Sequence, residues 1–244
     1  MAGTTVRGRL TWQLCPVVDI VDETHNAKSI VLDAPGWAGH KAGQHVDVRL
    51  TAEDGYQAQR SYSIASAPED EHLVITVERL DDGEVSPYLT DELRTGDSLE
   101  LRGPVGGYFV WDESLGGPVL LIGGGSGVVP LRAIRRHHRA IAGGTELCLL
   151  YSARSLSDVI YREELIGADD VHIFLTREWP DDWKGRRGRI NVELLADVVW
   201  PPERAPLVYV CGPTGFVETA AAALVDLGYA PGRIRTERFG PTGT

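Results

Sequence analysis

The pattern of apolar residues changes once along this chain, near residues 113–118, and this change limits the possible folds more than any other feature. Before it, short apolar or alternating stretches are separated by turn sequences such as Asp54-Gly55, which is typical of antiparallel strands. A single short helix is expected among them, at 86–93. Short strands at this spacing predict a small antiparallel barrel, with strands at 10–21, 29–32, 45–50, 61–64, 73–80 and 98–102.

Beyond residue 118 the apolar stretches alternate with helical patterns. Strands are expected at 119–122, 146–151, 171–176, 207–210 and 234–237, and helices at 128–142, 156–165, 192–199 and 214–227. Apolar strands bounded by helices are typical of a parallel sheet that is covered on both faces. The sequence therefore predicts a β plus α/β architecture, with an antiparallel β-barrel domain over residues 1–113 and a Rossmann-like, parallel-sheet domain over residues 114–244.

The net charge of −11 belongs to the first half of the chain. Residues 1–113 hold 9 Lys and Arg against 20 Asp and Glu, whereas residues 114–244 hold 15 of each kind. An acidic half disfavours nucleic acid and anionic membranes, so neither is predicted as a partner. No apolar run approaches the ~20 residues that span a bilayer, and the first residues lack the apolar stretch of a signal peptide.

The three cysteines, Cys15, Cys148 and Cys211, are far apart and form no CxxC pair. This spacing disfavours a disulfide framework, and it also disfavours a zinc site or an iron–sulfur cluster held by this chain. The histidines are scattered and show no metal-binding spacing. We therefore expect no metal in this chain and a cytoplasmic location.

A glycine-rich stretch follows the first strand of the second half. It reads Gly123-Gly124-Gly125-Ser126-Gly127 and leads through Val128 and Val129 to Pro130. Between a strand and a helix, glycines let the backbone approach a pyrophosphate, whose charge then lies at the helix N-terminus. The alternative is a tight turn that binds nothing. The match to GxGxxG is imperfect, because the third glycine position counted from Gly125 is Pro130.

The end of the next strand bears on the choice of nucleotide. NAD-binding folds often place an acidic residue there to bind the ribose 2′-hydroxyl, but this strand ends Tyr151-Ser152-Ala153-Arg154. Ser152 and Arg154 suit a 2′-phosphate, which favours NADPH over NADH. Later basic residues are candidates for the same pocket, namely Arg177, Arg186 and Arg189. The alternative for each of these arginines is a solvated surface charge.

Two motifs in the barrel half are ambiguous by pattern alone. They are Arg60-Ser61-Tyr62-Ser63 and Gly83-Glu84-Val85-Ser86. Arg60 is typical of a strand residue that pairs with an acid, and Tyr62 is typical of a packed aromatic. The turn from Gly83 can offer amides to a phosphate or simply lead into a helix cap.

A cationic run, Arg135-Arg136-His137-His138-Arg139, closes the first helix of the second half. Its members can dock an acidic partner protein, or they can be the cations that favour the C-terminal end of a helix dipole. The pattern favours the second interpretation.

Taken together, five motifs in order resemble the ferredoxin–NADP reductase superfamily. They are Arg60-Ser61-Tyr62-Ser63, Gly83-x-x-Ser86, Gly103-Pro104-x-Gly106, Gly123 to Pro130, and Cys211-Gly212-Pro213. The chain looks most like the flavoprotein reductases that serve oxygenases and ferredoxins, over roughly residues 10–240. The resemblance implies an FAD-binding barrel followed by an NAD(P)-binding domain.

For the flavin, the resemblance implies that Arg60 meets the FAD pyrophosphate, Tyr62 packs on the isoalloxazine ring and Ser63 lies near N5. It implies further flavin contacts from the adjoining strand and turn, at Ser61, Val77, Glu78, Arg79, Gly83, Val85 and Ser86. Glu237-x-Phe239 resembles the segment that closes over the flavin, with Phe239 on the ring face.

For the nucleotide, the resemblance implies that the glycine-rich stretch receives the dinucleotide. Cys211 is then expected near nicotinamide C4, in a pocket shaped by Gly212, Pro213 and Thr214. Ser63, Cys211 and Glu237 are the candidate catalytic residues.

The resemblance also implies how the chain functions. Some similar proteins carry a fused four-cysteine iron–sulfur domain, which the cysteine spacing does not predict here, so electrons from NADPH or NADH are expected to leave through FAD to a separate ferredoxin, iron–sulfur or oxygenase protein. A second possibility is a reductase of free flavin, quinone or another small acceptor. A third, from another class, is a non-catalytic dinucleotide-sensing subunit.

Overall fold

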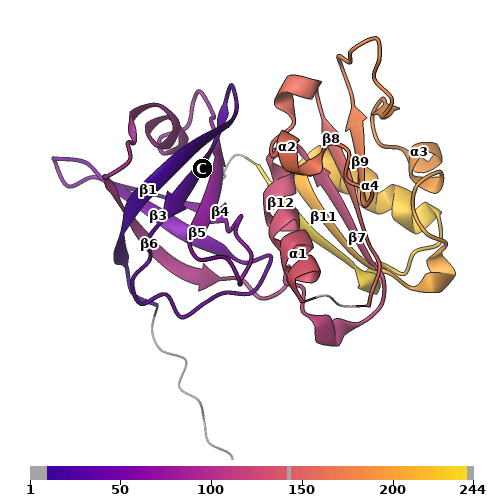
Figure 1. Ribbon diagram of the computed structural model, residues 1–244, viewed down its shortest axis with the longest axis horizontal. Helices are drawn as coiled ribbons and strands as arrows, with labels where there is room; N and C mark the ends of the chain where they lie inside the picture. The colour runs from indigo at the N-terminus through magenta and orange to yellow at the C-terminus, as the bar shows by residue number, and fades with distance from the viewer. Residues whose placement is uncertain (1–9, 142–143, 241–244) are drawn as a thin grey trace, which may run out of the picture.

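The computed structural model describes residues 10–141 and 144–240 and contains two six-stranded sheets side by side (Figure 1). The first sheet is antiparallel and runs in the order β4-β3-β6-β1-β2-β5. Its strands are β1 (Gln13–Thr24), β2 (Ala27–Leu32), β3 (His45–Thr51), β4 (Gln57–Ser63), β5 (Leu73–Glu78) and β6 (Ser98–Val105). An isolated bridge between Ile64 and Ile75 joins the two edge strands, so the sheet closes into the expected barrel.

The barrel closes because the long strand β1 pairs with β6 on one side and with β2 on the other. The first part of β1 pairs with β6, the second part pairs with β2, and the pairing with β2 is irregular between Val17 and Asp19. Alternate residues along the strands then point into one apolar core, which includes Val17, Ile30 and Leu101. The barrel was thus predicted correctly from strand spacing.

The short helix expected at 86–93 is present over residues 86–92, although most of it is π-helical. Ser86 and Pro87 are α-helical, and Tyr88–Glu92 form the π-helix, in which the amide of Leu93 donates to the carbonyl of Tyr88 at 3.0 Å. Leu89 and Leu93 are both buried in the barrel core, and Leu93 already has extended backbone angles. The helix therefore ends at Glu92, with both leucines packed in the barrel core.

The second sheet is entirely parallel and runs in the order β10-β9-β8-β7-β11-β12. Its strands are β7 (Val119–Gly124), β8 (Leu147–Ala153), β9 (Val171–Leu175), β10 (Arg186–Arg187), β11 (Leu207–Pro213) and β12 (Ile234–Phe239). The chain goes from β7 to β8 on one side and returns to β11 on the other. The carboxyl end of β7 is therefore the point where strand order reverses, which is where open α/β sheets bind ligands.

Helices cover both faces of this sheet, as expected (Figure 1). They are α1 (Val128–Ala140), α2 (Arg162–Leu165), α3 (Val192–Ala196) and α4 (Thr214–Asp226). The face that carries Leu120 and Val208 packs with α4, whereas the face that carries Leu121 packs with α1. Nowhere in residues 10–141 and 144–240 does a helix have the length and hydropathy needed to cross a membrane.

One apolar cluster extends from the α1 face of the sheet into the barrel half. It contains Leu121 and Ile134 together with Ala65, Phe109 and Trp111, all of them buried. The two halves are therefore packed against each other through a common core.

Two expected helices of the second half differ from the structure, and one strand was not expected. The helix at 156–165 is only a 3₁₀ turn at Leu156–Asp158 followed by α2, because Tyr161 between them has a left-handed backbone with φ of 58°. The helix at 192–199 ends at Ala196, and β10 was not expected, because two arginines carry no apolar pattern. The expected end of the first helix, residue 142, lies outside the described residues.

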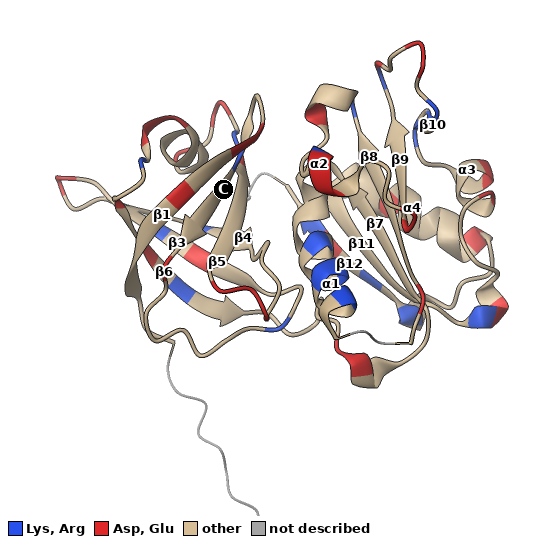
Figure 2. Cartoon of the chain, viewed as in Figure 1, with Lys and Arg blue, Asp and Glu red and all other residues tan. Residues whose placement is uncertain are grey.

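The arginines of the cationic run on α1, blue in Figure 2, form ion pairs within the protein. Arg135 has no exposed surface, and its guanidinium meets Asp170 through two hydrogen bonds of 2.8 Å and Glu164 at 3.2 Å. Arg139 binds the same Asp170 from the surface, at 3.0 Å. These contacts hold α1 against the α2 region rather than leaving it free for a partner.

The substitution Arg135→Met is expected to lower the free energy of unfolding by about 3 kcal/mol, because it leaves the half-buried Asp170 carboxylate without its two-pronged partner. The matched control is Arg139→Ala, which removes an exposed partner of Asp170 and is expected to cost no more than about 1 kcal/mol. Urea titration followed by far-UV circular dichroism measures both. Equal losses for the two variants would contradict the assignment of Arg135 as a buried structural ion.

Candidate functional site

The carboxyl edge of the parallel sheet brings together motifs that are far apart in sequence. Gly123 at the end of β7 pairs with Cys211 of β11 on one side and with Tyr151 of β8 on the other. Cys211 in turn pairs with Glu237 of β12. Residues that pair in a parallel sheet share a face, so Cys211 and Glu237 both point to the α1 face, which packs on the barrel.

The loop after β7 and the end of β11 touch through their backbones. A Cβ atom on Gly127 would lie 2.1 Å from the carbonyl oxygen of Cys211, which no real side chain tolerates. Gly212 has φ of 153°, and a Cβ there would lie 2.9 Å from the carbonyl oxygen of Gly124. Glycine is therefore required at both positions for these two loops to meet.

The same loop ends at the N-terminus of α1. Gly127 precedes the helix and supplies no side-chain cap, and Gly125 has the left-handed φ of 55° that favours glycine. The first amides of a helix without a side-chain cap are suited to a phosphate. The glycine stretch thus has the backbone donors that a pyrophosphate needs.

The basic residues chosen for a 2′-phosphate lie beside this loop. Ser152 pairs with Gly124, and the amide of Arg177 donates to the carbonyl of Arg154 at 2.9 Å, so the two arginines are neighbours at the ends of β8 and β9. Both side chains are exposed, and within residues 10–141 and 144–240 neither forms an ion pair.

The other two arginines predicted for this pocket belong to the β10 region. Arg186 pairs with Asp197 at 3.3 Å, so its charge is partly used by that carboxylate. Arg189 is exposed and lies two residues beyond the end of β10. The structure therefore groups Arg154 and Arg177 most closely with Ser152.

On the barrel, the two predicted flavin motifs converge. Arg60 lies inside β4, and its guanidinium meets the Glu84 carboxylate of the 83–86 turn at 2.9 Å. The hydroxyl of Tyr56 donates to the same carboxylate at 3.0 Å. Arg60 and this turn therefore lie side by side, and Arg60 pairs with an acidic residue, as its strand pattern alone predicted.

Tyr62 and Ser63 follow Arg60 toward the end of β4. Ser63 is buried and Tyr62 is half-buried against the barrel core, and burial raises the pKa of Tyr62 to about 12. The phenol of Tyr62 is therefore neutral across the physiological range, which suits stacking on an aromatic ring.

Several residues of the flavin prediction have limited freedom to contact a cofactor. Val77 and Val85 are buried in the barrel core, so only their backbones are available. Arg79 forms ion pairs with Asp81 and Asp91. Their cofactor roles stay predictions. Glu78 lies against the glycine loop, with Oε2 3.9 Å from the position of a Cβ on Gly125.

A mostly apolar cavity of about 270 Å³ lies between the barrel and β12. Its lining includes His45, Tyr108, Phe109, Thr236 and Glu237. Burial lowers the pKa of His45, so this imidazole is neutral at pH 7. Burial also raises the pKa of Glu237 to about 7, so half of the Glu237 side chains carry a proton near neutrality. The cavity is thus lined by two titratable groups without a strong fixed charge.

Cys211 borders the same region and is inert as a nucleophile. Burial, followed by the nearby Glu237 carboxylate, raises the pKa of the Cys211 thiol well above its usual value. A thiol that stays protonated is a small apolar group with a weak S–H donor. Cys211 can therefore shape a pocket and does not attack a substrate.

Sequence reasoning missed His45 and the 106–109 loop. His45 is the cross-strand partner of Ser63 and lies beside Gly106, where a Cβ would be 3.2 Å from its Nδ1. The signal was present, since 45–50 was expected as a strand and Ser63 was expected at a strand end. Their pairing register, however, was not predicted.

A barrel packed against a parallel sheet, with a phosphate-binding loop at the point of strand reversal, defines a two-domain flavin and pyridine-nucleotide oxidoreductase. The family model of the oxidoreductase FAD-binding domain matches residues 14–110, and that of the oxidoreductase NAD-binding domain matches residues 121–222. The chain belongs to the ferredoxin–NADP reductase superfamily of FAD- and NAD-binding oxidoreductases.

Three similar proteins illustrate this relationship. The glycine betaine monooxygenase reductase subunit of Pseudomonas aeruginosa is 31% identical over 95% of this chain, which spans 66% of that protein. The aromatic O-demethylase reductase subunit of an Amycolatopsis species is 30% identical over 99% of this chain and 76% of its own length. The FAD/NAD-binding domain of nitric oxide dioxygenase from Vibrio cholerae is 29% identical, with a TM-score of 0.80 over 93% of this chain and 98% of that domain.

The half-buried Glu237 gives a pH-dependent prediction. The pKa of Glu237 is about 7 in the folded protein, above the ordinary value of about 4.3. Between these two values the folded state binds more protons than the unfolded state. The free energy of unfolding therefore falls as the pH rises from about 4.3 to about 7. Between pH 5.5 and pH 8 the difference amounts to about 2 kcal/mol. Glu237→Gln is therefore expected to unfold at a higher temperature than the wild type at pH 8, with a much smaller gain at pH 5.5.

Differential scanning calorimetry at the two pH values measures this effect. Glu218→Gln on α4 is the control, because Glu218 is exposed and pairs with Arg238 at the surface. A gain for Glu237→Gln that is the same at both pH values would contradict a raised pKa.

Proposed function

We propose that the protein is an FAD-dependent NAD(P)H reductase that passes electrons to a separate oxygenase, ferredoxin or iron–sulfur component. The observation that carries this proposal is the packing of two sets of groups against each other. The glycine loop, Cys211 and Glu237 lie on the sheet face that packs on the barrel. The barrel packs Ala65 and Phe109 on that face, and the adjoining cavity is lined by His45, the cross-strand partner of Ser63. Such an arrangement is suited to two cofactors whose reacting ends must meet.

When bound, the nicotinamide supplies a hydride and the flavin accepts it and releases electrons one at a time, which is chemistry that no side chain offers. The residues suited to hold FAD are Arg60 at the pyrophosphate, the 83–86 turn beside it, and Tyr62 and Ser63 at the ring. The glycine stretch at the start of α1 suits the dinucleotide pyrophosphate, with Cys211 to Thr214 shaping the nicotinamide pocket. Phe239, at the end of β12 and packed against the common core, suits a flavin face.

The side chains at this junction provide orientation and a nearly neutral environment. Tyr62 and Cys211 are held uncharged by burial, so they pack against rings without attracting water. Glu237, with a pKa of about 7, is able to take up or release a proton near neutral pH at the cavity wall. Ser63, buried at the end of β4, offers a hydroxyl that is suited to orient a ring nitrogen.

We further propose that NADPH is the preferred nucleotide. Ser152, Arg154 and Arg177 lie together beside the glycine loop, and the two guanidinium groups are exposed at the strand ends. No acidic residue ends β8, so a ribose 2′-hydroxyl lacks the usual carboxylate partner there. Two neighbouring guanidinium groups are well suited to bind a phosphate dianion.

The relatives support the choice of acceptor. Two of the proteins described above are named as reductase subunits of a monooxygenase and of an O-demethylase. Because the chain spans only 66% of the first of these, the acceptor of this chain is part of the proposal. The boundary at residues 113 and 114 and a cytoplasmic location are likewise proposed, the latter because Cys15, Cys148 and Cys211 are free and buried.

The experiment that tests the proposed function is anaerobic stopped-flow absorbance of the FAD-loaded protein. Mixing with NADPH is expected to bleach the flavin band rapidly, and mixing with NADH is expected to bleach it more slowly. Fast bleaching by NADH alone would retain the reductase and overturn the nucleotide choice. A protein that stays colourless after FAD addition, or that is reduced by neither nucleotide, would favour the dinucleotide-sensing alternative.

The 2′-phosphate assignment predicts the effect of Arg154→Ala. Loss of one charge-assisted contact is expected to raise the KM for NADPH about tenfold or more and to leave the KM for NADH within about twofold. Arg204→Ala is the control, because Arg204 lies before β11, at the opposite end of the sheet, and pairs with Glu146. Steady-state kinetics with both nucleotides measures the effect, and equal changes for NADPH and NADH would exclude the assignment.

A further inference from the structure

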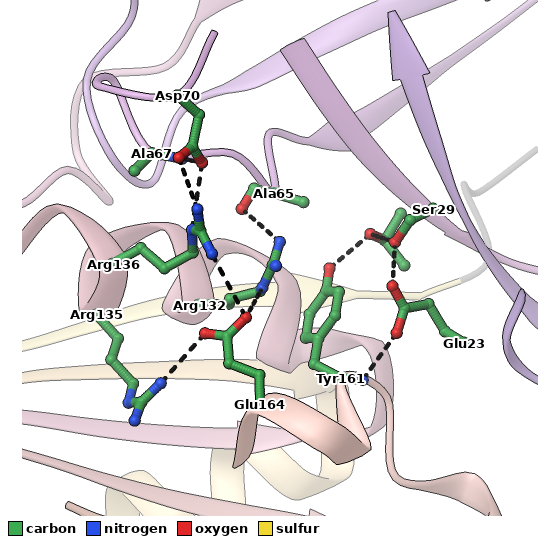
Figure 3. A network of polar contacts seen from close by, with 11 residues as sticks. Glu23, Ser29, Ala65, Ala67, Asp70, Arg132, Arg135, Arg136, Tyr161 and Glu164 are labelled. Carbon is green, nitrogen blue, oxygen red and sulfur yellow. Dashed lines mark hydrogen bonds and ion pairs between the residues drawn. The ribbon is translucent and has the colours of Figure 1, made fainter. Parts of the chain in front are cut away.

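The closest polar contact between the two halves is made by Tyr161, a residue that no sequence motif singled out. Its hydroxyl donates to Oγ1 of Thr76 on β5 at 2.5 Å, and its own amide donates to Glu23 on β1 at 3.1 Å (Figure 3). The guanidinium of Arg132 lies over the phenol ring, 4.2 Å from its centroid. Tyr161 thus reaches from the nucleotide half into the outer wall of the barrel.

The hydroxyl groups of Tyr161, Thr76 and Ser29 form a chain of hydrogen bonds in which each donates to the next. Burial raises the pKa of Tyr161, so its hydroxyl stays protonated and donates to Thr76. Ser29 lies 2.8 Å from Thr76 and 2.6 Å from the Glu23 carboxylate, and a carboxylate only accepts. Ser29 therefore donates to Glu23, Thr76 donates to Ser29, and the Tyr161 amide closes the ring on the second oxygen of Glu23.

The strained backbone of Tyr161 indicates that its surroundings hold this residue in place. A residue other than glycine with φ of 58° is strained, and such strain persists only where the surroundings impose it. Tyr161 is buried, at 4% exposure, and Thr76 and Ser29 are buried with it. The strain is thus held by the contact with the barrel rather than by a local turn sequence.

A second set of contacts joins the halves next to the first. Arg132 of α1 meets Glu164 of α2 at 2.6 Å and donates to the carbonyl of Ala65 at 3.3 Å (Figure 3). Arg136 forms a two-pronged pair with Asp70, at 2.6 and 3.2 Å. Ala65 is two residues beyond Ser63, and α1 starts directly after the glycine loop. The contacts therefore link the elements that carry the two cofactor motifs.

We propose that Tyr161, through its hydrogen bond to Thr76, is a positioning residue that sets the distance between the flavin-binding strand ends and the nucleotide-binding loop. This role rests on the proposed reductase function, because it matters for catalysis only if the two cofactors bind at these sites. Tyr161 touches neither motif directly. It acts by holding β5 and the start of α1 in one relative placement, so that the groups bound at the two motifs do not shift relative to each other.

The placement itself is measured without cofactors. Spin labels on Ser98→Cys in β6 and Ala222→Cys in α4 report the distance between the halves by pulsed electron resonance, because both positions are exposed and the three native cysteines are buried. In this background Tyr161→Phe and Thr76→Val are expected to broaden the distance distribution. Thr76→Ser keeps the hydroxyl and is expected to restore the narrow distribution.

The matched control is Tyr229→Phe, which removes a tyrosine hydroxyl that binds the carbonyl of Trp200 within the nucleotide half. With FAD and NADPH bound, Tyr161→Phe and Thr76→Val are expected to slow the limiting rate of flavin reduction about ten- to a hundredfold and to leave the nucleotide KM within about twofold. Tyr229→Phe is expected to alter neither the distance nor the rate.

The outcomes separate this proposal from the proposed function. An unchanged distance distribution in Tyr161→Phe and Thr76→Val would overturn the positioning role, and so would a broad distribution with an unchanged reduction rate. If the wild type is not reduced by either nucleotide, the proposed function fails. The distance measurement then still decides whether this contact fixes the placement of the halves.

Discussion

The tightest constraint in the molecule is the approach of two backbones at the carboxyl edge of the parallel sheet. Gly127 passes so close to the carbonyl of Cys211 that no side chain fits between them. This contact fixes the start of α1 relative to the end of β11, and through strand pairing it places Glu237 beside Cys211. The geometry of the nucleotide site therefore follows from backbone packing, and its side chains add charge and shape to a frame that already exists.

The groups around the cavity between the barrel and β12 carry little fixed charge. Burial lowers the pKa of His45, the phenol of Tyr62 is neutral, and burial raises the pKa of Glu237 to about 7. The strong charges of the region lie elsewhere, in the ion pairs of α1 with Asp70 and Glu164 (Figure 3) and with Asp170. The Arg136–Asp70 pair joins the two halves, whereas the junction where two ring systems are proposed to meet stays largely apolar.

Much of the fold could be predicted from the sequence, because strand spacing and strand–helix alternation are local patterns. The glycine stretch could also be placed, since its position between a strand and a helix is visible in the sequence. The meaning of Arg60 to Ser63 came only from the resemblance, as their pattern alone fits any strand. The failures have another cause. Arg135 was interpreted only as a cation near a helix C-terminus, because its partners, Asp170 and Glu164, come from distant segments that only the fold brings together.

Tyr161 is a failure of the same kind. The sequence 156–165 has a helical pattern, and the residue that interrupts it is strained by contact with the barrel, for which no neighbouring residue gives a signal. Similarly, His45 could be placed on a strand, but its pairing with Ser63 depends on a register that the sequence alone did not settle. Local patterns predicted elements, whereas contacts between the halves decided the details of the site.

The apolar cluster shared by the two halves has a consequence for biosynthesis. The barrel leaves the ribosome first, and until β7 and α1 follow, Ala65, Phe109 and Trp111 lack the residues that bury them in the finished protein. A nascent chain with such a surface is prone to association with other chains or with chaperones. The barrel is therefore a poor candidate for excision as a separate flavin-binding module, and genetic fusions are better placed at the chain ends than between β6 and β7.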